Sequence, residues 1–278
     1  MKSKYYTLAG LRLRADSETE IADSALYGEF YAPEGDCDIR VRVHQAPLPE
    51  RPSSLIAHKA DRDFYRDGGD VTLFSSYPFA EHTYLPYACR KGTGDEIDLT
   101  VDYAPGLWDA MLFHALNIPE LMARRGRFLL HSSFIIYHGE ALLFSADKGV
   151  GKSTQAALWE RYRGALIVNG DRSLLQLGKD GLTAHGTPYC GSSEIALNRS
   201  APVKAVVLLS QGPCNELRRC GGSFVMTRLL AQLSFESYQN ENAVDFALGL
   251  CANVPVFSYQ CLPDESAVTM LEESLWKN

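Results

Sequence analysis

The stretch that most constrains the fold of this 278-residue chain is residues 141–171. It reads ALLFSADKGVGKSTQAALWERYRGALIVNGD. An apolar run predicts a buried strand over 141–145, and the segment 154–162 has the pattern of a helix. A second apolar run follows and ends close to a carboxylate, Asp171. A strand, a tight turn, a helix and a strand in so short a span indicate an α/β unit.

The turn inside this stretch matches a phosphate-binding loop of the P-loop (Walker A) type. Its signature ends in Gly151, Lys152 and Ser153, and Ala146 stands where a first glycine is usual. Consecutive backbone N–H groups and the positive end of the following helix dipole hold a triphosphate in such a loop. Lys152 is expected to neutralise the β and γ phosphates, and the Ser153 hydroxyl to bind Mg²⁺. A chance glycine-rich turn is the alternative. The predicted nucleotide-binding residues are Ala146, Asp147, Lys148, Gly149, Val150, Gly151, Lys152, Ser153 and Thr154.

The composition argues against some classes of function. With 46% hydrophobic residues, 22% charged residues and a formal charge of -7, the chain has the make-up of an ordinary acidic globular protein. An acidic chain without a basic stripe is not expected to bind nucleic acid. No stretch approaches the roughly 20 apolar residues of a membrane span, and the N-terminus lacks the pattern of a cleaved leader. We therefore expect a cytoplasmic protein without a membrane partner.

The cysteines give no evidence for a disulfide framework or a zinc site. They are odd in number, widely scattered and free of any C-x-x-C pair. Such a pattern is typical of reduced thiols in the interior of an intracellular protein. The seven cysteines are Cys37, Cys89, Cys190, Cys214, Cys220, Cys251 and Cys261.

The part of the chain before residue 126 predicts a separate, β-rich domain. Up to about residue 89, short alternating segments are separated by Gly, Pro, Asp and Glu clusters, which indicates an antiparallel sheet. The segment 61–67 mixes charges with aromatic residues and is interpreted as a polar turn. Apolar spacing over 107–123 predicts a bridging helix that Pro119 kinks or divides. The expected domains are residues 1–125, for substrate or partner recognition, and residues 126–278, for nucleotide binding.

The second half predicts strands over 128–137 and 141–145, joined by a tight turn. Only one helix and one strand fit between Lys152 and Asp171, so Asp171 should lie at the carboxyl end of a strand beside the one that leads into the loop. A carboxylate there can bind Mg²⁺ or accept the proton of an attacking hydroxyl. The alternative is a turn residue, because Asn169-Gly170-Asp171-Arg172 is also a natural hairpin sequence.

The segment from His131 to Asp171 resembles the HPr serine kinase/phosphorylase family and its relative, ATP-dependent phosphoenolpyruvate carboxykinase. It is most similar to a less characterised group of HPr kinase-like proteins, and the resemblance covers roughly residues 128–260. In the kinases the loop reads G-D-S-G-V-G-K-S, which this chain matches except at Ala146 and Lys148. The segments that carry the resemblance are LHSS at 130–133, GVGKSTQAALW at 149–159, NGDR at 169–172 and GTPYCG at 186–191.

The resemblance implies a mixed α/β fold with an HPr kinase/carboxykinase-like P-loop core, and it implies roles for named residues. Lys152 becomes the phosphate-binding lysine, and Asp171 the proton acceptor for the substrate hydroxyl. Ser153 and Asp171 become metal ligands, with Glu194 near the position of a second Mg²⁺ ligand. His131 falls at the active-site histidine. For His131 the alternative is a hydrogen-bonded core residue, and for Glu194 a solvated side chain.

Two departures from the family pattern bear on function. Gly170 replaces the first aspartate of the family's Asp-Asp pair, which leaves one carboxylate fewer for metal binding. Residues 194–202, EIALNRSAP, stand in place of the glycine-rich loop that the kinases use for phosphorylase activity and HPr contact. The second departure argues against HPr itself as the substrate. Arg199 in this segment is either a clamp on the transferred phosphate or a surface residue.

These features together predict an ATP-dependent phosphotransferase. It would use ATP or GTP and Mg²⁺ to phosphorylate a serine-type hydroxyl of a protein, peptide or small molecule. The alternative, suggested by Ala146 and Gly170, is a nucleotide-binding regulatory or scaffold protein without catalysis. The sequence does not identify the acceptor, and a homo-oligomer stays open.

Overall fold

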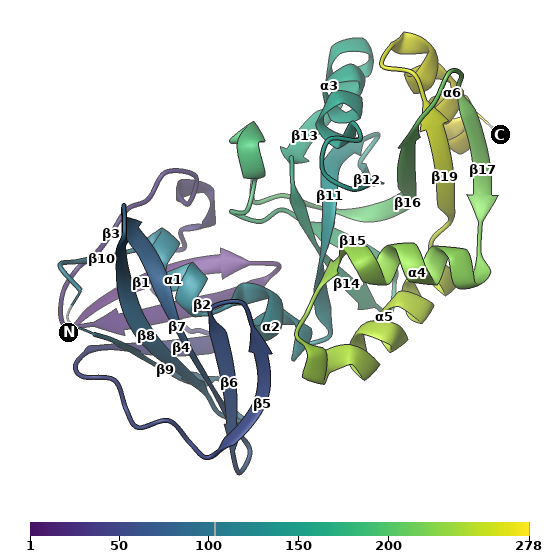
Figure 1. Cartoon of the computed structure of the whole chain (residues 1–278). Helices are drawn as coiled ribbons and strands as arrows, with labels where there is room; N and C mark the ends of the chain where they lie inside the picture. The colour runs from purple at the N-terminus through teal and green to yellow at the C-terminus, as the bar shows by residue number, and fades with distance from the viewer. Residues whose placement is uncertain (103, 278) are drawn as a thin grey trace. The chain divides into compact units, whose positions relative to one another are not determined.

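The computed structural model describes residues 1–102 and 104–277, which form two compact units (Figure 1). The first unit comprises residues 1–121 together with 236–238, and the second comprises 122–235 and 239–278. Strands and α-helices both contribute, so the fold is mixed α/β, as the sequence predicts. Within the described ranges, no helix combines the length and apolar character needed to span a membrane.

The first unit is built on an eight-stranded sheet. Its strands are β1 Lys2–Leu8, β2 Leu11–Ser17, β4 Ile39–Gln45, β5 Ser54–Lys59, β6 Arg62–Asp67, β7 Asp70–Ala80, β8 Thr83–Lys91 and β9 Glu96–Val101. They pair in the order β1-β2-β4-β9-β8-β7-β6-β5. A two-stranded pair, β3 Ile21–Ala22 with β10 Leu107–Trp108, completes the unit's strands.

This sheet is mixed, so the prediction of an antiparallel region is wrong for part of it. The pairs β2–β4 and β4–β9 are parallel. Parallel neighbours need long connections, and both of these pairs are joined by long segments, whereas the short turns elsewhere give antiparallel hairpins. Strand β4 alternates as expected, with Ile39, Val41 and Val43 buried.

Two local predictions in the first unit are also corrected. Segment 61–67 is not a turn, because β6 pairs with β5 and β7 and buries Phe64 completely. The bridging helix is divided as α1 Asp109–Ala115 and α2 Ile118–Ala123, but the break lies at Asn117, whose φ is 45°. Pro119 falls in the first turn of α2, where a missing N–H costs no helical hydrogen bond.

Residues 236–238 are anchored in the first unit by buried polar groups. Lys91 forms an ion pair with Glu120, and the two side chains are 3% and 0% exposed. Tyr238 donates from its hydroxyl to Glu120 Oε1 at 2.8 Å, and Asn117 Nδ2 donates to Glu236 Oε1 at 3.2 Å. A segment that follows residue 235 in the sequence is therefore part of the interior of the first unit.

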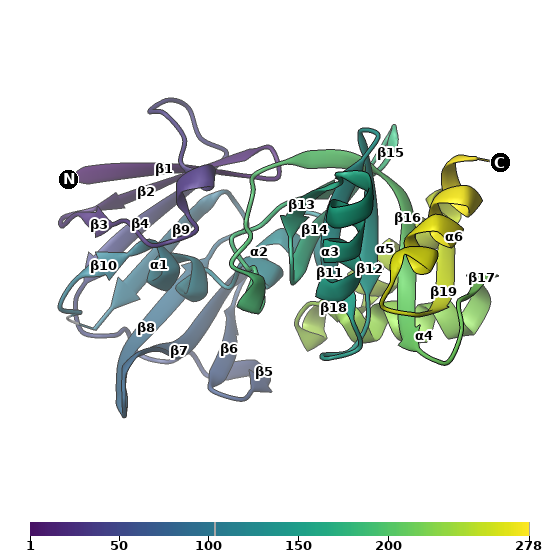
Figure 2. The ribbon, with the colours of Figure 1, turned by 90° about the horizontal axis from the view of Figure 1, so that it is seen from above.

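The second unit contains the predicted loop and a sheet covered by helices on both faces (Figures 1 and 2). Its helices are α3 Lys152–Arg163, α4 Gly222–Gln232, α5 Asn240–Asn253 and α6 Glu265–Trp276. Its strands are β11 Arg127–Tyr137, β12 Glu140–Ser145, β13 Leu166–Asn169, β14 Arg172–Gly178, β15 Gly181–His185, β16 Ser200–Gln211, β17 Glu216–Cys220, β18 Leu233–Ser234 and β19 Val256–Cys261.

Alternate residues of the central strands face opposite helical layers. Leu142 and Phe144 of β12 pack in one cluster with Trp159 of α3 and Leu271 of α6. Leu143, between them, packs in another cluster with helices α4 and α5. Strand β12 is parallel to β16, which is parallel to β19. Parallel strands buried on both faces read as continuous apolar runs, which is why 141–145 shows no polar alternation.

Strand β11 is hydrogen-bonded to the strand that leads into the loop and to the two strands that flank residues 169–172. It pairs with β12 on one side, whereas on its other side β13 pairs near its end and β14 near its start. Both β13 and β14 are antiparallel to β11 and follow one another along its edge. Residues 169–172 therefore connect two strands that continue in the same direction, and they do not form the hairpin that was the alternative for Asp171. Strand β13 is separated from β12 by β11, which corrects the expectation that the two are neighbours.

The buried Lys91–Glu120 pair predicts a large effect of one substitution. Glu120→Ala leaves the Lys91 ammonium buried without its carboxylate, which costs about 3–5 kcal/mol of unfolding free energy. The matched control is Arg90→Ala on the same strand, because the Arg90 side chain is 61% exposed in its pair with Asp70. An exposed pair contributes about 1 kcal/mol or less. Urea unfolding measures both, and equal losses would contradict the prediction.

The second unit predicts a pH-dependent stability. His185 is buried, and burial lowers its pKa from 6.5 to about 4. Between pH 6.5 and about pH 4 the unfolded chain therefore binds a proton at His185 that the folded chain does not bind. The contribution of His185 to the free energy of unfolding is fully present above pH 6.5 and decreases as the pH falls through this range. Between pH 7 and pH 5 the loss is about 2 kcal/mol. Urea unfolding of His185→Gln should lack this part of the dependence; parallel profiles for the two proteins would contradict the assignment.

Candidate functional site

One cavity of the second unit gathers the predicted catalytic residues. It has a volume of about 640 Å³ and receives side chains from β11, α3 and the 169–172 turn. His131, Lys152 and Asp171 all contribute to its wall. The lining residues are His131, Lys148, Gly149, Gly151, Lys152, Ser153, Thr154, Gly170, Asp171, Arg172, Cys190, Gly191, Ser192 and Ser193.

The loop of residues 146–151 wraps around the ammonium group of Lys152. Lys152 is the first residue of α3 and is 7% exposed. Its Nζ donates to the carbonyl oxygen of Ala146 at 2.9 Å and to that of Asp147 at 3.3 Å. Gly149 and Gly151 have φ of 84° and 127°, values that glycine tolerates and other residues rarely adopt. Burial lowers the pKa of Lys152, and the charges of Asp171 and Asp147 oppose that shift.

The start of α3 offers further groups to an anion. Ser153 and Thr154 are exposed in its first turn and line the cavity. The first N–H groups of any α-helix have no partner within the helix, and its dipole is positive at that end. The cavity therefore combines a buried ammonium, two hydroxyls and a helix N-terminus. Such a set suits a phosphate group.

Asp171 is held in place by a network that joins the motifs of the sequence. Asn169 Oδ1 accepts from the backbone N–H groups of Asp171 and Arg172, both at 2.8 Å. Asn169 Nδ2 donates to the carbonyl of Thr187 at 2.7 Å, and Thr187 Oγ1 donates to that of Arg172 at 2.8 Å. Ser133 Oγ donates to the carbonyl of Gly170 at 3.0 Å. The NGDR, LHSS and GTPYCG segments thus form one hydrogen-bonded support for the carboxylate.

The Asp171 carboxylate faces two nitrogen groups. His131 Nε2 lies 3.2 Å from Asp171 Oδ1, and Arg172 Nε lies 3.5 Å from Oδ2. The hydrogen bond from His131 is the largest cause that lowers the pKa of Asp171, with the charges of His131, Arg172 and Lys152 adding to it and burial opposing it. The carboxyl group is therefore ionised at neutral pH. His131, for which a core position was the alternative, lines the cavity beside this carboxylate.

Gly170 and Gly191 lie where a side chain would collide with Ser193 or Asp171. A Cβ on Gly170 would lie 2.1 Å from Ser193 Oγ and 2.5 Å from Ser193 Cβ. A Cβ on Gly191, whose φ is 59°, would lie 3.0 Å from Asp171 Cβ. The space beside Gly170 is thus filled by the side chain of Ser193.

The remaining predicted residues lie apart from this group. Glu194 is exposed and ends a short 3-10 turn, Gly191–Ser193, with a φ of 54°, and it is not among the residues that line the cavity. Arg199 is exposed and donates to the carbonyl of Asn198 at 3.2 Å. Ala146 and Val150 shape the loop from outside the lining.

The donor set fits a magnesium ion that is bound largely through phosphate. Among the residues described, no group of three or more His, Cys, Asp or Glu side chains is arranged to hold a metal ion. Mg²⁺ with a nucleotide keeps several waters and takes few protein ligands. The Ser153 hydroxyl and the Asp171 carboxylate both line the cavity and provide oxygen ligands of the required kind.

Sequence reasoning gave no role to several residues that shape the site. Asn169 and Thr187 orient the turn, Ser193 donates to the Cys190 carbonyl, and Gln232 contacts His131 Nδ1 from α4. Asn169 and Thr187 lie inside the motifs quoted above, so their positions carried a signal. Gln232 lies at the end of a helix far away in the sequence, and no pattern marks it.

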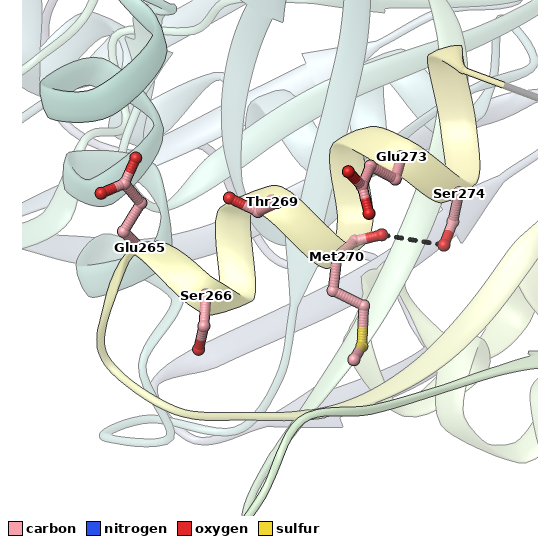
Figure 3. Close-up of a pocket in the computed structure, with 6 residues that line it drawn as sticks. All are labelled: Glu265, Ser266, Thr269, Met270, Glu273 and Ser274. Carbon is pink, nitrogen blue, oxygen red and sulfur yellow. Dashed lines mark hydrogen bonds between the residues drawn. The ribbon is translucent and has the colours of Figure 1, made fainter.

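A second hollow, along the outside of α6, lacks such convergence (Figure 3). Its volume is about 580 Å³, and its lining comes from this one helix. Figure 3 shows the side chains spread along the helix, with Ser274 donating to the carbonyl of Met270 at 2.8 Å. Its charged groups are Glu265 and Glu273, and its lining, as far as the structure describes it, includes no basic residue. Glu265 already pairs with Arg163 at 3.3 Å and Glu273 with Lys277 at 3.7 Å, so the site is assigned to the first cavity, where a buried ammonium, hydroxyls and a helix N-terminus converge.

Comparison with known proteins leaves the family open. No protein-family model matches the sequence, and no curated protein matches it. Among solved structures, the HPr(Ser) kinase/phosphatase from Coxiella burnetii is similar, with 16% sequence identity and a TM-score of 0.32. The match covers 54% of this chain and 88% of that chain. A similarity at this level carries no argument about the chemistry, which therefore rests on the residues of the cavity.

Proposed function

We propose that this protein is an ATP-dependent phosphotransferase of the HPr kinase-like type, with a P-loop core in its second unit. It transfers the γ-phosphate to a serine-type hydroxyl of a protein, peptide or small molecule. The observation that carries the proposal is the meeting of Lys152 and Asp171 in one cavity at the start of α3. Phosphoryl transfer requires these two groups, one for the phosphates and one for the acceptor.

Lys152 binds the β and γ phosphates in this proposal. Its ammonium group exchanges the carbonyl oxygens of Ala146 and Asp147 for phosphate oxygens, while the N–H groups of residues 146–151 and of the first turn of α3 complete the contact. Because burial lowers the pKa of Lys152, a nearby dianion favours its charged form. The Ser153 hydroxyl and Asp171 carboxylate would hold Mg²⁺, which supplies neutralisation of the phosphate charge.

Asp171 accepts the proton of the attacking hydroxyl. Its carboxylate is ionised at neutral pH and lines the cavity of about 640 Å³ together with Lys152. Asn169, through the two N–H groups of the turn, fixes the backbone that carries it. Arg172 and His131 stabilise its charge. We propose that the first unit recognises the acceptor or another partner.

One observation supports a second candidate function, a nucleotide-binding regulatory or scaffold protein. Ser193 fills the space beside Gly170, where the kinases carry an additional aspartate. A site with a single carboxylate retains the groups that bind phosphate but has fewer ligands for Mg²⁺. Nucleotide binding without transfer is the expected behaviour in that case.

The two candidates predict different results for Asp171→Ala. In the phosphotransferase, transfer of labelled γ-phosphate from ATP into a cell extract falls by about 100-fold or more, because the general base is removed. Nucleotide binding, measured by calorimetry, persists in Asp171→Ala and is lost in Lys152→Ala. The matched control is Asp180→Ala, an exposed aspartate in the turn between β14 and β15, which should leave both quantities unchanged.

Equal transfer by the wild type and Asp171→Ala would exclude Asp171 as the base. No transfer by the wild type, with binding that depends on Lys152, would favour the regulatory protein. Mass spectrometry of the labelled species identifies the acceptor when transfer is seen.

The space beside Gly170 gives a further prediction. Gly170→Asp forces Ser193 to move and breaks its hydrogen bond to the Cys190 carbonyl, so we expect a loss of about 1–3 kcal/mol of unfolding free energy. In Gly170→Asp with Ser193→Gly the clash is removed and a second carboxylate enters the site. Urea unfolding should recover in this double variant. Equal stability of Gly170→Asp and the wild type would show that Ser193 does not limit the position.

A further inference from the structure

Gln232, the last residue of α4, is held next to His131 by the main chain. The strand that follows it, β18, pairs with β11, with Leu233 opposite Leu130. His131 is the next residue of β11. Arg172 also donates from Nη1 to Ser234 Oγ at 2.5 Å. Gln232 is therefore carried by backbone that is hydrogen-bonded to the site and is not a free helix end.

The side-chain amide of Gln232 joins two residues of the site. Its Nε2 donates to Asp147 Oδ1 at 2.8 Å. Its Oε1 lies 2.9 Å from Nδ1 of His131. None of the roles assigned above to Asp147 or His131 uses these contacts, and they connect the 146–151 loop to the group beside Asp171.

The chemistry of the three groups fixes the direction of each hydrogen bond. The Asp147 carboxylate can only accept, so the NH₂ side of the amide faces it. The amide oxygen then faces His131, and Nδ1 must carry a hydrogen to donate. The other ring nitrogen, Nε2, lies 3.2 Å from Asp171 Oδ1 and donates to this ionised carboxylate, which can only accept. The chain Asp147, Gln232, His131 and Asp171 has one consistent orientation.

We propose that Gln232 is a positioning residue of the site. Asp147 orients its amide, and the amide holds the His131 ring so that Nδ1 faces the amide oxygen and Nε2 is directed at the carboxylate of Asp171. The loop that is proposed to bind phosphate thereby sets the geometry around the proposed base. The expected effect of Gln232 on turnover rests on the proposed function, whereas its effect on the His131 ring does not.

The test of the ring uses the full chain labelled with ¹⁵N-histidine and two-bond ¹H–¹⁵N spectra at one fixed pH. The signals of His131 are those that disappear in His131→Gln. The wild type should show a protonated Nδ1. Gln232→Leu removes the acceptor of the Nδ1 hydrogen while Nε2 keeps its hydrogen bond to Asp171, so the Nδ1 signal should move to the unprotonated range.

Three further variants separate positioning from general damage. Gln232→Glu combined with Asp147→Asn lets the new amide at position 147 donate to the carboxylate, keeps an acceptor for Nδ1, and should restore the wild-type ring signals. Asp147→Asn no longer dictates the amide orientation and should weaken the Nδ1 protonation. The matched control is Gln211→Leu, because Gln211 Nε2 contacts the carbonyls of Gly149 and Val150 at 3.4 Å but does not touch His131. Its His131 signals should be those of the wild type.

An unprotonated Nδ1 in the wild type, or the same His131 signals in Gln232→Leu, would overturn the proposal. Turnover of γ-labelled ATP in the cell extract supplies the second readout. Gln232→Leu should lower kcat about tenfold while the KM for ATP stays within about twofold, with recovery in the double variant Gln232→Glu with Asp147→Asn. Altered ring signals with unchanged kcat would refute the catalytic part. Altered ring signals in a protein without any turnover would refute the proposed function and leave the positioning intact.

Discussion

The pairing of β11 with strands on both of its sides is the interaction on which the site depends. Ser132 of β11 faces Ser145 at the end of β12 and also donates its N–H to the carbonyl of Asp171 at 2.9 Å. The backbone of Ser132 therefore connects β12, which leads into the 146–151 loop, with the turn that carries Asp171. A displacement of β11 along either neighbour would separate the ammonium group of Lys152 from Asp171.

Because β11 sets this geometry, side chains with quite different local structures meet in the same small volume. Lys152 begins a helix, His131 lies within a strand and Asp171 lies in a turn. Each is oriented by backbone that has its own hydrogen bonds, such as those of Asn169 to the turn. Loop flexibility is thus restricted where a binding pocket needs fixed donors. The charges in the cavity also compensate one another, since the positive charges of Lys152 and Arg172 both lower the pKa of Asp171.

The sequence was informative where one element determines its own structure. The apolar run before Ser145 predicted β12, and the residues after Gly151 predicted α3, because local periodicity specifies both. The association of His131 with Asp171 could be anticipated only through the family resemblance. The parallel pairing of β4, the burial of Phe64 in β6 and the contact of Gln232 with His131 could not be predicted. Each is decided by which distant segment lies alongside, and local patterns do not contain that information.

The placement of residues 236–238 changes how the chain is divided. A chain with two consecutive domains crosses between them once, whereas this chain crosses after residue 121, after residue 235 and after residue 238. No single cut in the gene can therefore release the second unit with all of its sequence and leave the first unit complete. Glu236 and Tyr238 would lose Asn117 and Glu120, which hold them inside the first unit. A simple truncation therefore cannot yield both units intact.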